Sequence, residues 1–138
     1  MNKLIYVFSL VIFLFSACST VNKSECENLI CTEEFRMVQV KFIDASGNPV
    51  LLKDFAAINK RTGESTVQNN EPATINNRGN YIVASDADLK KLSEAGDVIN
   101  VSATHPISNK KIEAEFVVSG GICACHISQI SGPAIMTF

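Results

Sequence analysis

The stretch FRMVQVKFIDASGNPV, residues 35–50, carries the clearest structural signal in the chain. Its first ten residues alternate in character, and Val38, Val40 and Phe42 fall on one face. A period of two with β-branched residues is typical of a half-buried β-strand. The cluster of serine, glycine, asparagine and proline that follows predicts a turn. The stretch therefore predicts a strand that ends in a tight turn and leads into a second strand.

The same pattern of short alternating segments and turn signals continues to the end of the chain. Further strands are predicted near residues 54–60, 65–68, 73–76, 81–85, 97–105, 111–119 and 122–130. One short helix is predicted to begin after Ser85, where Asp88 completes a capping box, and to end before Gly96 at the C′ position. Together these elements predict an all-β fold, an antiparallel β-sandwich of seven to eight short strands with one short helix, over residues 35–138.

A core is expected where the apolar faces of these elements meet. The predicted core residues are Val38, Val40, Phe42, Phe55, Ile58, Tyr81, Val83, Leu89, Leu92, Ile99, Val101, Phe116 and Val118.

The turn chemistry resembles that of a known group of sandwiches. Asp44, Gly47, Pro49 and Val50 match the D-x-x-G-x-P-V element of the prealbumin-like (transthyretin-like) and carboxypeptidase regulatory-like domains. RGNY at residues 78–81 is similar to their D-G-x-Y element, with arginine in place of the acidic residue. The strand at 96–103 and the lone helix add to the resemblance, which spans roughly residues 36–118. It implies a β-sandwich and assigns no function, because these motifs are turn chemistry.

Residues 1–17 resemble a bacterial lipoprotein signal peptide. Lys3 precedes an unbroken apolar run, and FSAC at residues 15–18 resembles a lipobox, with phenylalanine in place of the usual leucine. The resemblance implies that cleavage occurs before Cys18 and that its thiol carries lipid. An ordinary secreted protein, in which Cys18 is incidental, is the alternative. Residues 18–34 are then a polar tether that contains cysteines.

The chain as a whole resembles small lipoproteins of Gram-negative envelopes, and this resemblance implies a location and a set of partners. Serine after Cys18 resembles the outer-membrane sorting pattern, so the protein is expected on that membrane, facing the periplasm. The expected partners are the membrane, through the lipid anchor, and an envelope protein or a glycan. The net charge of −2 and the scattered basic residues argue against nucleic acid.

The five cysteines fit an oxidising compartment. Lipidation of Cys18 leaves four thiols, Cys26, Cys31, Cys123 and Cys125, which predict two disulfides. A bridge between Cys123 and Cys125 would be strained in an extended strand. We therefore expect both to be joined to Cys26 and Cys31, with the order of pairing left open. Each bridge would close a loop of about 90–100 residues and stabilise the fold by up to ~4–5 kcal/mol, less for the second.

CACH at residues 123–126 also admits a different hypothesis. Cys123, Cys125 and His126 could bind copper or zinc, with His105 as a further ligand, or act in thiol redox chemistry. If residues 122–130 form a strand, however, alternation places the two sulfurs on one face and the imidazole on the other. The stretch is one residue short of a haem attachment motif. No resident cofactor is therefore expected.

The sequence contains no recognised catalytic motif. There is no G-x-S-x-G elbow, and Glu113 and Glu115 fit the solvated face of an amphipathic strand. The expectation from sequence is a non-catalytic envelope lipoprotein whose β-sandwich is a binding or structural module. A soft-metal or thiol-redox protein is the alternative.

Overall fold

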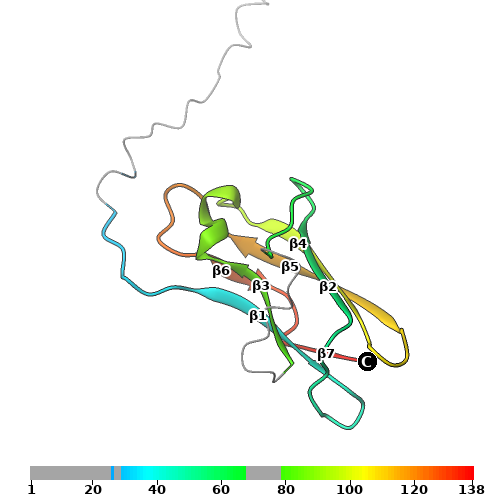
Figure 1. The fold of residues 1–138 in the computed structure, drawn as a ribbon. Coiled ribbons are helices and arrows are strands. Elements are labelled where there is room, and N and C mark those ends of the chain that lie inside the picture. Colours follow the sequence, from blue (N-terminus) through cyan, green and yellow to red (C-terminus); the bar gives the residue numbers. More distant parts are fainter. Residues whose placement is uncertain (1–25, 27–28, 68–78) are drawn as a thin grey trace, which may run out of the picture.

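Seven strands in two facing sheets make up the protein in the computed structural model, which describes residues 26, 29–67 and 79–138 (Figure 1). Sheet order is β3-β1-β7 in one layer and β2-β4-β5-β6 in the other. The strands are β1 (Met37–Ile43), β2 (Asp54–Asn59), β3 (Asn80–Ser85), β4 (Asp97–Thr104), β5 (Lys111–Ser119), β6 (Ser128–Ser131) and β7 (Ile135–Thr137). The predicted all-β sandwich is confirmed.

β1 and its turn form as the opening stretch predicts. Val38, Val40 and Phe42 are buried, with Val40 and Phe42 fully inaccessible. In the turn, Asp44 Oδ1 accepts the backbone N–H groups of Ser46 and Asn48, both at 2.8 Å. Aspartate at the start of a turn favours this geometry because its side chain replaces a backbone acceptor.

The core lies between the two sheets and matches most of the predicted set. Buried apolar side chains are Val38, Val40, Phe42, Val50, Ala57, Tyr81, Val83, Ala84, Leu92, Ile99, Val101, Ala103, Phe116, Val118, Ile127 and Met136. Phe55 and Leu89 are partly buried and pack against this core. At its centre, the rings of Phe42 and Tyr81 meet edge to face with centroids 5.4 Å apart, an arrangement that the ring quadrupoles favour.

The prediction that Ile58 lies in the core is wrong. In β2 the buried positions are Ala57 and Asn59, so Ile58 lies on the opposite face of the strand. The inward Asn59 donates from Nδ2 to Asp97 Oδ2 at 2.8 Å, and Arg61 Nε donates to Asp97 Oδ1 at 2.6 Å. Phe55 and Ile58 are three residues apart, so they cannot both face inward in a regular strand, and the inward position next to Ile58 is occupied by the polar Asn59.

The strands predicted near 65–68 and near 73–76 have different outcomes. Ser65 makes only an isolated bridge with Ile58, so the segment near 65–68 is not a regular strand in its described part. The strand predicted near 73–76 lies outside the described residues.

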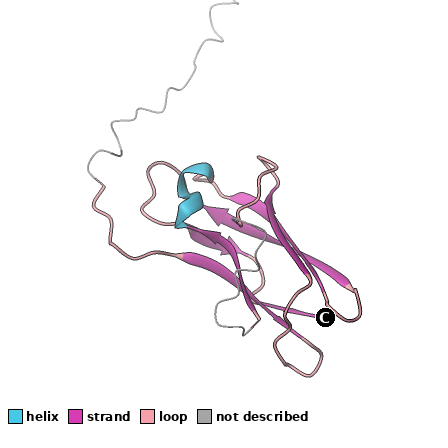
Figure 2. Ribbon diagram, viewed as in Figure 1, coloured by secondary structure: helices cyan, strands magenta, loops and turns pink. Residues whose placement is uncertain are grey.

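The predicted helix is present but is shorter than expected. It is a 3-10 helix, η3, at Asp86–Lys91, and Figure 2 shows it at one end of the sandwich. The capping box forms, with the Ser85 backbone N–H donating to Asp88 Oδ2 at 3.1 Å. Leu92 is already extended, so Gly96 is not the helix C′ residue; it lies in the turn before β4, with φ of +96°. Among the described residues, no helix is both long and apolar enough to cross a membrane.

The last part of the chain departs most from the prediction. Residues 120–127 form a loop rather than a strand, and β6 begins only at Ser128. Around Gly132 the chain passes from the four-stranded sheet to the three-stranded one, where β7 was not predicted. β7 pairs with β1 in parallel, whereas the other strand pairs are antiparallel as expected. Met136 pairs opposite Phe42 and closes the core at this edge.

Candidate functional site: the disulfide junction

Two disulfides join the segment before β1 to the loop between β5 and β6. They link Cys26 to Cys123 and Cys31 to Cys125, with Cα atoms 5.0 and 5.2 Å apart. These Cα separations are normal for disulfides. The structure thus selects one of the two pairings that the sequence left open. We call these four cysteines and the loop 120–127 the disulfide junction.

A pair of glycines sets the course of the junction loop. Gly120 and Gly121 donate backbone N–H groups to the carbonyls of Ser93 and Leu89, at 3.1 and 2.8 Å. Gly121 has φ of +108°, and a Cβ there would lie 2.3 Å from Glu94 Cγ. A Cβ at Gly120 would lie 2.6 Å from the Leu89 carbonyl oxygen, so only glycine allows the backbone to approach η3 this closely, and the positive φ of Gly121 also favours glycine. The glycine pair comes directly after Ser119, where β5 ends.

His126 is the polar centre of the junction. Its Nδ1 lies 2.7 Å from Asp86 Oδ2, and its Nε2 lies 2.9 Å from Thr32 Oγ1. A neutral imidazole that donates from Nδ1 to Asp86 can accept the Thr32 hydroxyl at Nε2. The His126 side chain is only 9% exposed. The imidazole therefore connects the segment before β1 with η3 and the junction loop.

Asp86 receives donors from both sides of the junction. Its Oδ2 accepts the Arg36 backbone N–H at 2.9 Å, and its Oδ1 accepts the Ile127 backbone N–H at 2.8 Å. Burial opposes ionisation of this carboxyl, but the two backbone donors and His126 outweigh it, so the pKa of Asp86 lies below its usual value. The ionised carboxylate is thus the form that holds the junction together.

Replacing Asp86 with asparagine is expected to destabilise the protein by roughly 1–3 kcal/mol at pH 7, since charged hydrogen bonds are lost. A carboxyl with a lowered pKa in the folded state stabilises the fold above its unfolded pKa of about 3.9, and this contribution disappears as pH falls through the folded pKa. The difference in unfolding free energy between wild type and Asp86→Asn should therefore be constant near neutral pH and shrink below about pH 4.

Urea unfolding at several pH values measures this difference. Asp54→Asn is the matched control, because Asp54 is exposed at the start of β2 and should show little effect. An equal effect of the two substitutions would contradict the role given to Asp86.

The Thr32 hydroxyl, the His126 imidazole and the Asp86 carboxylate are linked in the order found in serine hydrolases. The surroundings of Thr32 do not suit that chemistry, however. Glu34 Oε1 lies 3.8 Å from His126 Nε2, and hydrogen bonds and charge from Arg36 lower the pKa of Glu34. A carboxylate beside the hydroxyl would repel the oxyanion of an acyl-transfer intermediate, which hydrolases stabilise with donors. The geometry therefore favours a structural link over a nucleophile.

The two remaining sequence-predicted residues are Cys18 and His105. Cys18 lies outside the described residues. His105 lies at the turn after β4, where its Nδ1 accepts backbone N–H groups from Ile107 and Ser108, both at 3.2 Å, and its ring packs on Phe138. It does not join His126.

The residues of the metal hypothesis are all engaged in other bonds. Cys123 and Cys125 are in disulfides, so they offer a thiolate only after reduction, and His126 uses both ring nitrogens. Within residues 26, 29–67 and 79–138, no group of three or more potential metal ligands is assembled.

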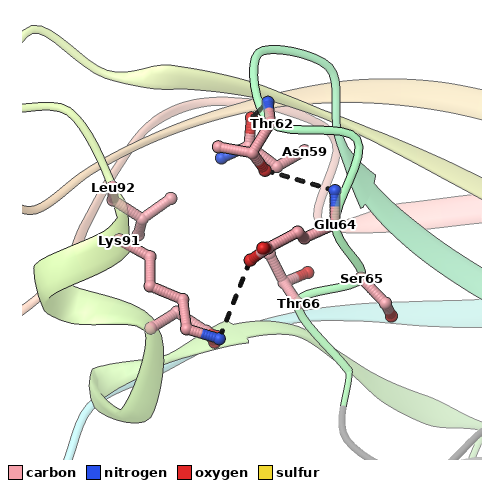
Figure 3. A pocket seen from close by; sticks show the side chains of 8 residues that line it. Asn59, Thr62, Glu64, Ser65, Thr66, Lys91 and Leu92 are labelled. Atoms are coloured by element: carbon pink, nitrogen blue, oxygen red, sulfur yellow. Dashed lines mark hydrogen bonds and ion pairs between the residues drawn. The ribbon is translucent and has the colours of Figure 1, made fainter.

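A small pocket lies between β2, the segment after it and η3 (Figure 3). Lys91 Nζ and Glu64 Oε2 lie 3.9 Å apart at its wall. Its volume of about 10 Å³ leaves room for about one water molecule. It cannot hold a substrate, so it does not compete with the junction as a functional site.

Sequence reasoning missed Asp86 and Thr32 as partners of His126. They lie 40 and 94 residues away from it along the chain. Asp86 is the first residue of the predicted helix, and no local pattern in the sequence indicates a contact between residues so far apart.

Comparison with known proteins gives no relative for this arrangement: no protein-family model, no curated protein and no solved structure matches the chain.

Proposed function

We propose that the protein is a non-catalytic lipoprotein of the cell envelope, whose β-sandwich serves as a binding or structural module. Cys18 carries the lipid, and the sandwich, prealbumin-like in its turn motifs, faces the periplasm from the outer membrane. The module is expected to bind an envelope protein or a glycan through its loops.

The disulfide junction is the observation that carries this proposal. Two disulfides that close separations of 97 and 94 residues fit an oxidising compartment, and they use all the cysteines other than Cys18. The remaining thiol is the one at the lipobox. An even set of paired cysteines plus one acylated cysteine accounts for the odd total of five.

The junction also limits the distance between the lipid and the folded domain. Seven residues separate Cys18 from Cys26, so even a fully extended chain spans at most about 28 Å between these two Cα atoms. The junction therefore stays within about 28 Å of the anchored residue.

Replacing Cys18 with serine is expected to abolish incorporation of labelled fatty acid and to release the protein from the membrane fraction. Cys26→Ser is the matched control, since it removes one thiol eight residues later and should keep the label. A Cys18→Ser protein that still partitions into detergent with the same mature mass would overturn the lipid assignment.

The soft-metal or thiol-redox hypothesis remains the second candidate. The observation in its favour is that the four sulfurs lie together on residues that are all at least partly exposed, within reach of a reductant. Thiol titration of the unfolded, unreduced mature protein separates the two candidates. Absence of free thiols supports the first, whereas two free thiols, or stoichiometric copper or zinc, supports the second.

A further inference from the structure

Two apolar side chains are exposed at the outer edge of the disulfide junction. Ile30 is 97% exposed and Leu29 is 46% exposed. We call this pair the apolar tip. Ile122, next to Cys123, is a further exposed apolar side chain at 55%. Single exposed apolar residues are common on protein surfaces, so exposure alone assigns no role to the tip.

The apolar tip is held by covalent bonds on both sides. Residues 26–31 and 123–125, six and three in number, close a ring through the two disulfides. Within it, the Leu29 backbone N–H donates to the Cys26 carbonyl at 3.3 Å, and the Ile30 carbonyl oxygen lies 3.9 Å from Cys125 Sγ. A surface that is already ordered loses less conformational entropy when it binds.

Its place in the chain distinguishes the tip from other exposed apolar residues. Leu29 and Ile30 follow Cys18 by only 11 and 12 residues. Ile107 is almost as exposed, at 85%, but lies in the turn that precedes β5, whereas the junction loop follows β5. The nine residues of β5 place these two sites about 30 Å apart, at opposite ends of the sandwich (Figure 1).

We propose that the apolar tip inserts into the lipid surface that holds the anchor at Cys18. This inference rests on the proposed function, because lipidation supplies the membrane. A side chain that is almost fully exposed gains by leaving water for the acyl boundary. The contact is apolar, so zwitterionic phospholipid suffices and anionic lipid adds no strength. Together, anchor and tip fix the orientation of the domain on the membrane.

The chain contains no tryptophan, so one introduced indole reports on its own surroundings. The test uses the full lipidated protein with Ile30→Trp, reconstituted in phosphatidylcholine vesicles with brominated acyl chains. Ile107→Trp is the matched control, with the same substitution at the far end. We expect the fluorescence at position 30 to shift to shorter wavelength and to be largely quenched, with no change at position 107. Leu29→Trp provides a second reporter, and peptide mapping checks that each variant keeps both disulfides.

The outcomes separate this inference from the proposed function. If the wild-type protein does not float with vesicles and carries no lipid, the proposed function fails. If the lipidated variants float but the reporters at positions 29 and 30 stay as accessible as the one at 107, only the tip contact is overturned. Equal quenching at both ends would also overturn it, because the proposed orientation keeps Ile107 away from the bilayer.

Discussion

Replacing both Cys123 and Cys125 with serine is expected to lower the free energy of unfolding by about 5–7 kcal/mol, a large share of the 5–15 kcal/mol typical of a domain. The first bridge to form closes a loop of more than 90 residues in the unfolded chain, which in the chain-entropy model is worth about 4–5 kcal/mol. The second then closes only a ring of nine residues and adds about 2–3 kcal/mol.

Because the second bridge closes only a small ring once the first has formed, the losses of unfolding free energy from the two single substitutions should not be additive. Cys123→Ser or Cys125→Ser alone should cost about 2–3 kcal/mol, because the remaining bridge still ties the two ends together. The double variant should therefore cost more than the two singles combined. Urea unfolding of the four proteins measures the coupling.

Reduced wild type is the control for this series. It should match the double variant in stability, and the double variant should not respond to reductant. A double variant as stable as wild type would show that the junction contributes nothing to the fold.

Phe42→Ala is expected to destabilise the protein by about 3–5 kcal/mol, the range for a buried phenylalanine reduced to alanine. The side chain is fully inaccessible, and its ring packs against Tyr81, Phe55 and Phe138 with centroids 5.4 to 6.1 Å away. The loss combines the transfer free energy of the ring with the cavity that it leaves, since partners from two strands and the C-terminus cannot all move inward.

Phe35→Ala is the matched control, because Phe35 is 61% exposed just before β1. It should change the unfolding free energy by less than about 0.5 kcal/mol. Similar losses of unfolding free energy for Phe42→Ala and Phe35→Ala would contradict the placement of Phe42 on the inward face of β1.

Local patterns were enough to predict β1, β4 and β5. Each of these strands alternates over seven or more residues, and Val40, Ile99 and Phe116 lie inward as their period requires. In β2 the same method failed at Ile58, because the inward position next to it holds Asn59, whose partner Asp97 is 38 residues away. A polar residue satisfied by such a distant partner looks like a surface residue in the sequence.

The C-terminal part could not be predicted for a different reason. β7 has three residues, which is too short for a period to be visible, and its parallel partner β1 is about 90 residues earlier. The loop 120–127 contains alternating apolar residues but does not pair as a strand, because Gly120 and Gly121 bind to the carbonyls of Ser93 and Leu89.

The junction could be predicted only in part. The cysteine count indicated that both ends of the chain are tied together. The two possible ways of pairing Cys26 and Cys31 with Cys123 and Cys125 close loops of nearly equal length, so the sequence did not distinguish them. The role of His126 was not visible either, since Asp86 and Thr32 approach it only in the folded protein.

Peptide mapping without reduction tests whether disulfides tie the N-terminal segment to the junction loop. Trypsin should cut after Lys23, Arg36 and Lys111, which releases residues 24–36, with Cys26 and Cys31, and residues 112–138, with Cys123 and Cys125. We expect these two peptides to be recovered as one species, four hydrogens lighter than their sum, which separates on reduction. Recovery of the two peptides as separate species before reduction, with free thiols or with internal bridges, would contradict this expectation.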